Sequence, residues 1–556
     1  MNFSNIKEFT SRHAELLTVL LLLFCCIVLF FVNIGIYALM DVDETRYVSM
    51  AREMFESKDF LTLYLDKEFF FEKPPLYFWG ECLSFALFGK INEMTARFPV
   101  ALYGMLSTFL VYFVGRKIVS RNYGLIAALI MATSLEFIIL SKFAILDIVV
   151  SACIGFSTLF GFMTFFCKEK NKKYFWWLFY IFSGLAVMAK GIPGFIVPFG
   201  IMFFASIFTK RFKEIFKPQY FIVGTLLFLL IVLPWHIIML KLHGQLFWNE
   251  YFIKHHWQRF VSSEEINRAE PFYFYIVTFL WGFFPWTVSA LAVGIAKIKE
   301  LFKNKIQKIK PFDEMDNSQK FMYLNIIGFL FTFIFFSASS TKLITYILPV
   351  YFFSACIFAF VWKDYIEKEK YKKPIDISVY ILGIFVLIAA IAGMLTVVYL
   401  PAQLYQDILH TKWLCVGGLL VFGIWSLWSV IKNKRILIFA AYIAFIGFAS
   451  AFLTEDFFEI DYKFGQDDLM RYAKFAKEQN ADLTSFGFSK RYSLLFYYST
   501  VVEFEKELDY EYLNNELKSK NTYIIIKNKD TEKIDQNVDF NIIEKGRKYS
   551  LIKGIQ

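Results

Sequence analysis

Long runs of apolar residues recur along most of this chain, and short polar or charged segments separate them. A helix needs about 20 consecutive apolar residues to cross the hydrocarbon core of a bilayer. The first run is longer than the roughly 7–15 residues of a signal-peptide core, and no A-x-A site follows it, so we expect an uncleaved span. The runs predict thirteen spans, at about 16–39, 94–115, 122–140, 145–166, 174–189, 192–208, 219–240, 272–296, 321–338, 343–362, 376–400, 411–431 and 436–453.

Lysine and arginine are concentrated in every second loop between these runs. Because basic residues gather in cytoplasmic loops, this alternation predicts a cytoplasmic amino terminus and a carboxy-terminal tail on the opposite side. The separation of the fifth and sixth spans is the weakest part of the count, since only Lys190-Gly-Ile-Pro193 lies between them. The basic loops are 116–121, 168–173, 210–217, 297–320, 363–373 and 432–435.

Two loops on the outer side, 41–93 and 241–271, are too long to be simple connectors. Apolar residues within 45–57 recur at helical spacing, which predicts an amphipathic helix along the membrane surface. Beyond about residue 455, helix-like stretches (466–479 and 510–518) alternate with strand-like runs (522–527 and 549–552). We therefore expect a membrane domain over 1–454 and a small soluble α/β domain over 455–556.

The composition supports a membrane protein and excludes several other classes. Hydrophobic residues make up 57% of the chain and charged residues 19%, against about 45–50% and 25% in soluble domains. The net charge of +10 is explained by the basic loops, so we expect no nucleic-acid partner. Seven cysteines form no CxxC motif, which argues against a zinc site or a disulfide framework. No phosphate-binding glycine motif is present, which argues against a pump driven by its own ATP hydrolysis.

The strongest candidate for chemistry is Asp41-Val-Asp-Glu-Thr-Arg46, directly after the first span. Acidic residues beside an apolar span are costly unless they are paired or hydrated, so they indicate function. An equally ordinary explanation is a loop in which an aspartate caps the next helix. Taken singly, the other candidates also have ordinary explanations, such as lysines at helix ends that reach toward the membrane surface.

The predicted topology, however, places all these candidates on one side of the membrane. They are the acids Asp43, Glu44 and Asp147, the cations Lys73, Lys190, Arg259 and Lys342, and also His255, His256 and Tyr346. Cations neutralise phosphate oxygens, and carboxylates can orient or deprotonate an acceptor. The set therefore indicates chemistry on a lipid-linked phosphate.

Together these motifs resemble the membrane-embedded GT-C glycosyltransferases, on the branch of the ArnT-type aminoarabinose transferases of lipid A and the protein O-mannosyltransferases. The likeness extends over nearly the whole chain and implies an α-helical polytopic membrane protein with about thirteen transmembrane helices and a small C-terminal α/β periplasmic domain. Thr345 stands where ArnT-type members often have proline. The motifs are Asp43-Glu-Thr-Arg-Tyr47, Ala51-Arg-Glu-Met54, Phe71-Glu-Lys-Pro-Pro75, Ala96-Arg-Phe-Pro99, Asp147, Lys190-Gly-Ile-Pro193, His256-Trp-Gln-Arg-Phe260 and Lys342-Leu-Ile-Thr-Tyr-Ile-Leu-Pro349.

The resemblance implies roles for individual residues. Asp43 would be the principal catalytic carboxylate, supported by Glu44 and Asp147. Arg46, Lys73, Lys190, Arg259, Lys342 and Tyr346 would bind the donor phosphate and substrate. Glu72 and His256 occupy positions that could share a divalent ion, but the family generally needs no metal, so we expect no required cofactor.

The implied activity is transfer of a sugar, an aminosugar or related group, from undecaprenyl phosphate to lipid A at the periplasmic face of a bacterial inner membrane. We expect a monomer with the amino terminus in the cytoplasm and the tail in the periplasm. A hydroxyl acceptor would require Asp43 as a general base, whereas a lipid A phosphate would need it only for positioning. Two alternatives are a protein O-glycosyltransferase with the same donor and a lipid-sugar transporter, although we find no internal repeat typical of transporters.

Overall fold

The structure is a computed structural model that describes residues 13–258, 270–303, 310–395, 402–453, 466–498, 502–506, 509–518, 522–534 and 539–555. Helices predominate, and each of the thirteen predicted spans contains a helix. The chain divides into two compact units. The first comprises Met1–Ile34, Phe71–Tyr77 and Arg97–Thr454, and the second Gly35–Phe70, Phe78–Ala96 and Glu455–Gln556.

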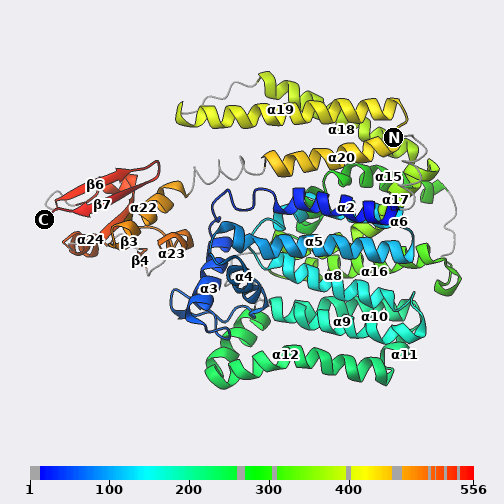
Figure 1. The fold of residues 1–556 in the computed structure, drawn as a ribbon, viewed down its shortest axis with the longest axis horizontal. Coiled ribbons are helices and arrows are strands. Elements are labelled where there is room, and N and C mark those ends of the chain that lie inside the picture. The colour runs from blue at the N-terminus through cyan, green and yellow to red at the C-terminus, as the bar shows by residue number, and fades with distance from the viewer. Residues whose placement is uncertain are drawn as a thin grey trace. The chain divides into compact units, whose positions relative to one another are not determined.

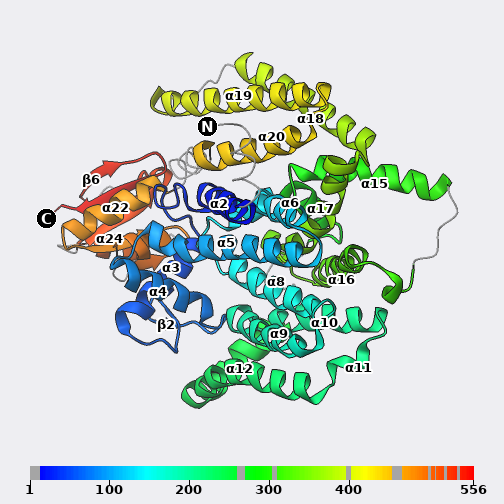
Figure 2. The ribbon, with the colours of Figure 1, turned by 45° about the vertical axis from the view of Figure 1, so that its right-hand side comes forward.

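The apolar helices form the first unit, where the long ones run roughly parallel or antiparallel to one another (Figures 1 and 2). A helix satisfies its backbone polar groups internally, which is required where lipid offers no partner. The helices are α2 (Ala14–Cys26), α5 (Glu93–Ile118), α6 (Arg121–Ala132), α7 (Leu135–Leu140), α8 (Asp147–Met163), α9 (Glu169–Lys190), α10 (Pro193–Phe208), α11 (Phe212–Ile215), α12 (Pro218–Phe247), α14 (Phe274–Gly282), α15 (Trp286–Lys303), α16 (Asn317–Ala338), α17 (Val350–Lys368), α18 (Lys372–Leu395), α19 (Ala402–Ile431) and α20 (Arg435–Phe448).

Seven helical stretches in the described chain are long and apolar enough to cross a membrane, or eight if a bent pair is one span. That pair is α14 and α15, whose axes differ by 117°. The break holds Pro285, which has no N–H to continue the helix ladder. Some predicted spans are shorter helices in the structure, and the third is divided between α6 and α7.

Short π-helical and 3₁₀ segments extend or interrupt these helices. The helix α12 runs past the end of its predicted span, and Gly244 kinks it with a positive φ of 54°, a conformation that glycine adopts without steric cost. A π-helix, η2 (Trp248–Gln258), continues it. The others are η1 (Ile27–Phe31), η3 (Phe312–Glu314), η4 (Ile344–Ile347) and η5 (Ala449–Leu453).

A buried lysine joins three distant parts of the first unit. The ammonium of Lys142 donates hydrogen bonds to the carbonyl oxygens of Val32, 3.1 Å away, and Ser450, 2.8 Å away. Val32 follows η1 and Ser450 lies in η5, and helix ends leave carbonyls without an intrahelical partner. Lys142 therefore ties the first and last spans to the loop before α8.

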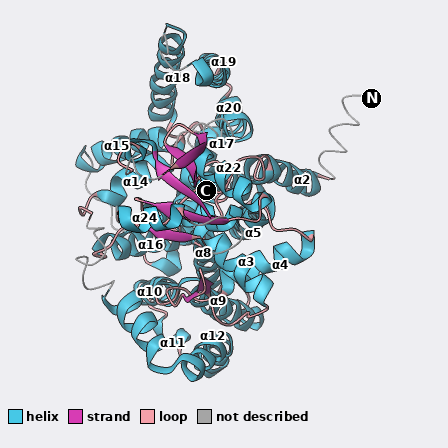
Figure 3. Ribbon diagram, turned by 90° about the vertical axis from the view of Figure 1, so that its left-hand side faces the viewer, coloured by secondary structure: helices cyan, strands magenta, loops and turns pink. Residues whose placement is uncertain are grey.

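The second unit combines a helical hairpin with the carboxy-terminal domain. Its amphipathic helix α3 (Asp43–Ser57) and helix α4 (Leu76–Phe88) flank a small hairpin of β1 (Tyr64–Leu65) and β2 (Glu68–Phe69). The tail forms a five-stranded sheet of order β4-β3-β5-β7-β6 (Figure 3). Its parallel strands are β4, β3 and β5, and the remaining pairs are antiparallel.

Helices α22 (Asp467–Glu478), α23 (Tyr492–Tyr498), α24 (Tyr510–Leu517) and α25 (Asn528–Thr531) complete the tail domain. Its core contains Phe486 and Leu513 with isoleucines of the central strands. The predicted small α/β domain is therefore confirmed. Its strands are β3 (Asp482–Phe486), β4 (Glu503–Glu505), β5 (Thr522–Lys527), β6 (Phe540–Lys545) and β7 (Tyr549–Gly554).

Candidate active site

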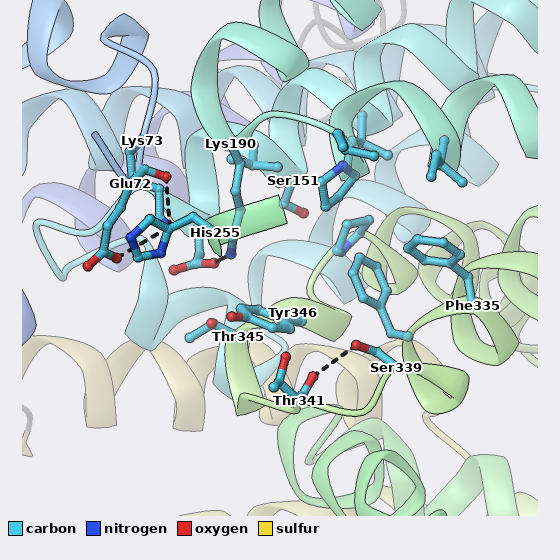
Figure 4. Close-up of a pocket in the computed structure, with 18 of the residues that line it drawn as sticks. Glu72, Lys73, Ser151, Lys190, His255, Phe335, Ser339, Thr341, Thr345 and Tyr346 are labelled. Atoms are coloured by element: carbon cyan, nitrogen blue, oxygen red, sulfur yellow. Dashed lines mark hydrogen bonds and ion pairs between the residues drawn. The ribbon is translucent and has the colours of Figure 1, made fainter. Parts of the chain in front are cut away.

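A cavity of about 370 Å³ lies within the first unit (Figure 4). Charged side chains such as Lys73 and Lys190 gather at one end of it, and Phe335 lies at the other. This division suits an amphiphile with an anionic head and a hydrocarbon chain. The polar lining residues are Glu72, Lys73, Asp147, Ser151, Lys190, His255, Ser339, Thr341, Thr345 and Tyr346.

An ion pair between Lys190 and Asp147 is part of the cavity lining. Asp147 is the first residue of α8 and Lys190 the last of α9. Each charge therefore complements the dipole of its own helix, negative at the N-terminus and positive at the C-terminus. Both side chains are largely buried, at 13% and 15% exposed, so the site holds two compensating charges away from bulk water.

The turn after Lys190 explains why the Lys190-Gly-Ile-Pro193 sequence folds so tightly. Gly191 has a φ of 85°, which favours glycine. Pro193 opens α10 at the first helical position, where its missing N–H costs nothing. A Cβ on Gly194 would lie 2.3 Å from the backbone of Ala186, so α9 and α10 pack closely and fix Lys190 at the cavity.

Three other predicted residues join this cluster. The ammonium of Lys190 lies 4.1 Å from the ring centroid of Tyr346, a cation–π distance. Lys73 lies beside Glu72, and its ammonium donates to the Glu72 carbonyl oxygen at 3.2 Å. Figure 4 shows His255 next to both of them. The structure therefore brings Lys73, Glu72, Asp147, Lys190 and Tyr346 to one cavity.

Three predicted residues are placed differently or fall outside the described structure. The ammonium of Lys342 donates to the carbonyl oxygens of Ser339 and Glu270, at 2.8 and 3.1 Å, so it braces the loop that carries Thr341 and Thr345. Arg259 and the side chain of His256 lie outside the described residues. His255, the residue before His256, lines the cavity.

The acidic cluster belongs to the second unit, where its three carboxylates have distinct environments. Asp41 accepts hydrogen bonds from the Ser493 N–H at 2.8 Å and the Ser493 hydroxyl at 2.6 Å. Glu44 is buried and accepts the Met40 N–H at 2.9 Å. Asp43 is 59% exposed, and its carboxylate pairs with the Arg46 guanidinium at 2.9 Å. Of the three, Asp43 is the one presented to solvent.

The helix that carries Asp43 is held by the tail domain at a second point. Arg52 donates to the carbonyl oxygens of Phe496 and Leu495, at 2.6 and 2.8 Å. These carbonyls lie near the C-terminal end of α23, where carbonyls lack intrahelical donors. Burial lowers the pKa of the Arg52 guanidinium, opposed by the charges of nearby Glu56 and Glu53.

No three histidine, cysteine, aspartate or glutamate side chains in the described part of the chain gather where they could hold a metal ion. Glu72 is near His255 (Figure 4), but two ligands make an incomplete site for a divalent ion. The charged and phenolic groups described at the cavity are those of Lys73, Lys190, Tyr346, Glu72 and Asp147.

Three kinds of comparison relate the chain to known proteins. The family described as dolichyl-phosphate-mannose-protein mannosyltransferase matches residues 15–244. An uncharacterized protein of Aquifex aeolicus (strain VF5) is 29% identical over 374 residues, 67% of this chain and 68% of that protein. The undecaprenyl phosphate-alpha-4-amino-4-deoxy-L-arabinose arabinosyl transferase 2 of Proteus mirabilis (strain HI4320) is 26% identical over 388 residues, 69% of this chain and 66% of that one. The chain thus spans about two thirds of the length of these relatives.

The fold comparison extends further along the chain. The crystal structure of ArnT from Cupriavidus metallidurans bound to undecaprenyl phosphate aligns with a TM-score of 0.77 at 19% identity, covering 97% of this chain and 99% of that one. The same protein in the apo state also gives a TM-score of 0.77. The likeness shows that the chain has the GT-C fold, a multi-pass helical membrane domain with a small sheet domain at its carboxy terminus.

The sequence relatives and the fold point to the same group of proteins. The chain is similar to the GT-C membrane glycosyltransferases, in the group that contains ArnT and the protein mannosyltransferases. The resemblance predicted from the motifs is therefore confirmed.

Proposed function

We propose that this protein transfers a sugar, an aminosugar or related glycosyl group, from undecaprenyl phosphate to lipid A. The observation that carries the proposal is the cavity of the first unit, which combines two lysines at one end with apolar walls at the other. An anionic head and a prenyl chain need that combination. The arabinosyl transferases among the relatives carry undecaprenyl phosphate in their names, which supports the same donor here.

The proposed reaction is a displacement at the anomeric carbon of the sugar. An acceptor oxygen forms the new C–O bond while the bond to the lipid phosphate breaks, and the phosphate departs with the electron pair. Phosphate monoesters have a second pKa of about 6, so the departing group needs charge stabilisation more than a proton. Lys73 and Lys190 supply that stabilisation, and preorganised charge of this kind contributes about 3–4 kcal/mol for each well-placed donor.

Asp43 is proposed to act on the acceptor. A lipid A phosphate is already ionised and nucleophilic, so Asp43 would position it or a neighbouring group rather than remove a proton. Its exposure supports contact with substrate, whereas Asp41 and Glu44 are already engaged by the protein. Arg259, Lys342, Arg46 and Glu44 remain proposed members of the site, in supporting roles.

The proposed setting is a bacterial inner membrane, with the cavity facing the periplasm, the amino terminus in the cytoplasm and the tail in the periplasm. The alternation of basic loops supports this orientation. We propose a monomer that requires no metal, with a divalent ion at Glu72 and His256 as an optional addition.

Protein O-glycosylation is the second candidate, because the mannosyltransferase family matches residues 15–244. Purified protein would be incubated with a donor radiolabelled in the sugar, together with either lipid A or a serine- and threonine-rich peptide. We expect undecaprenyl phosphate release and label on lipid A. Label on the peptide alone would select the second candidate, and movement of intact donor across vesicles without release would indicate a transporter.

A further inference from the structure

The cavity contains hydroxyl groups that the proposed mechanism leaves unused. Ser151 and Thr345 line its wall, and their side-chain oxygens are buried without a hydrogen-bond partner in the described structure. The Ser151 side chain as a whole is 1% exposed. A buried hydroxyl without a partner is destabilising, so each of these groups calls for a ligand that supplies one.

Ser151 differs from the other two hydroxyl side chains within helix α8. A buried serine or threonine within a helix commonly donates to the carbonyl oxygen four residues earlier. On the same helix α8, Thr158 bonds the Ile154 carbonyl oxygen at 2.9 Å. Ser157 bonds the Phe179 carbonyl oxygen at 2.8 Å and the Ser183 hydroxyl at 2.7 Å. In contrast, the Ser151 hydroxyl turns toward the cavity.

The position of Ser151 indicates which part of a ligand it would meet. It follows Asp147 by one helical turn, on the same face of α8, and Figure 4 shows it beside Lys190. Ile154, a further turn along, belongs to the apolar lining. Ser151 therefore lies where the cationic end of the cavity meets its apolar end.

We propose that Ser151, assisted by Thr345, donates a hydrogen bond to the phosphate of the prenyl-phosphate donor and of the released prenyl phosphate. The proposal rests on the proposed function, since it assigns a further binding residue to the same donor. A ligand whose phosphate contacts Lys190 and whose chain follows the apolar wall places its phosphate oxygens next to this hydroxyl. A neutral donor adds a hydrogen bond to the phosphate without adding charge to a membrane-embedded site.

Binding of undecaprenyl phosphate to the full-length protein in detergent tests this directly. Ser151→Ala is expected to raise the Kd about tenfold, which corresponds to 1.4 kcal/mol, while Ser151→Thr keeps the hydroxyl and stays within about threefold of the parent. Thr345→Val is expected to give a smaller increase. Undecaprenol, which has the same chain but no phosphate, should bind Ser151→Ala and the parent equally.

Ser157→Ala is the matched control, because it removes a hydroxyl from the same helix that bonds to protein partners. It should leave the Kd for undecaprenyl phosphate unchanged. An unchanged Kd in Ser151→Ala would overturn the inference, and so would an equal loss of undecaprenol binding. If the parent protein itself fails to bind undecaprenyl phosphate, the proposed function fails instead, so the two results are distinguishable.

Discussion

The carboxylate of Asp41 binds Ser493 through two hydrogen bonds, although 452 positions separate the two residues in the sequence. One oxygen accepts the Ser493 backbone N–H and the other the Ser493 hydroxyl. Ser493 lies in the first turn of α23, where N–H groups lack intrahelical partners, and Asp41 caps it from another part of the chain. The acidic cluster therefore contains a structural carboxylate two residues from the proposed catalytic one.

Asp41→Ala should loosen the tail domain from α3. Hydrogen bonds to a charged group contribute about 1.5–3 kcal/mol, so we expect a fall of about 2 kcal/mol in the free energy that holds α23. Faster cleavage of the tail by a protease at low temperature would report it. Ser493→Ala, which keeps the N–H bond, should show a smaller effect, and Asp482→Asn, on the exposed start of β3, should show none. If the protease cleaved the tail of the Asp41→Ala and Asp482→Asn variants at equal rates, this prediction would be wrong.

Asp43 and Glu44 are neighbours whose variants should fail in different ways. Asp43→Asn removes an exposed charge and should lower kcat at least 100-fold while leaving the melting temperature nearly unchanged. Glu44→Ala leaves the Met40 N–H without its acceptor in a buried site, which costs about 1–3 kcal/mol. The main effect of this variant should therefore be a lower melting temperature and not a lower kcat.

Transfer assays beside thermal melts of both variants separate these outcomes. An Asp43→Asn enzyme that retained full turnover on a lipid A phosphate and on a hydroxyl acceptor would remove Asp43 from the mechanism. If Asp43→Asn kept full turnover only with the phosphate acceptor, Asp43 would act solely as a general base for hydroxyl acceptors.

The ion pair of Lys190 and Asp147 predicts opposite effects on phosphate binding. Lys190→Met leaves the carboxylate of Asp147 facing the ligand, so the Kd for undecaprenyl phosphate should rise about 10- to 100-fold. Asp147→Asn releases Lys190 and removes a like charge, so the same Kd should fall about threefold or more. Titration at two salt concentrations measures both. Weaker binding in both variants would show that the pair acts as an intact structural unit instead.

The sequence was sufficient for the helical pattern and for the charged residues of the cavity, for identifiable reasons. A long apolar run predicts a membrane helix by itself. The ends of two such runs fall at Asp147 and Lys190, which are the first residue of α8 and the last of α9. Ser151 carried no such signal, because a single serine within an apolar run is common. Its spacing of four residues from Asp147 was the available clue.

Patterns in the sequence could not predict contacts between segments that lie far apart in the chain. The pairing of Asp41 with Ser493 could not be predicted, because Ser493 lies in another domain of the predicted arrangement. The position of His255 at the cavity depends on the local path of η2, a π-helix whose side-chain directions do not follow the usual 3.6-residue period. Lys142 likewise gave no sign that it would bond carbonyls of the first and last spans.

Glu169 predicts a loss of stability in acid. Hydrogen bonds from Lys172, Tyr220 and Lys217 lower the pKa of this carboxyl to about 2. A carboxyl whose folded pKa is lowered stabilises the fold above its unfolded pKa of about 4.3, and this contribution disappears as the pH falls toward 2. Melting temperatures at pH 6 and pH 3 should therefore differ less in Glu169→Gln than in the parent. Tyr220→Phe removes one hydrogen bond and should be intermediate, whereas parallel pH profiles in all three proteins would contradict the assignment.

Gly282 should be intolerant of any side chain. A Cβ at this position would lie 2.1 Å from the Tyr351 hydroxyl oxygen and 2.4 Å from a carboxylate oxygen of Glu136, and those two atoms share a hydrogen bond of 2.7 Å. Because both partners are buried, relieving the clash would break their bond and leave a carboxylate without its donor. We expect Gly282→Ala to cost about 2–4 kcal/mol, combining overpacking with a lost buried hydrogen bond.

Gly294→Ala is the matched control, since nothing lies within 4 Å of a Cβ placed there. A helical position with open space gains from alanine, by up to about 1 kcal/mol. Thermal melts of the two variants in the same detergent should therefore shift in opposite directions. A Gly282→Ala protein as stable as the parent would mean that α14 can move away from α7 and α17 at low cost, and that the Glu136–Tyr351 contact does not fix the bend before α15.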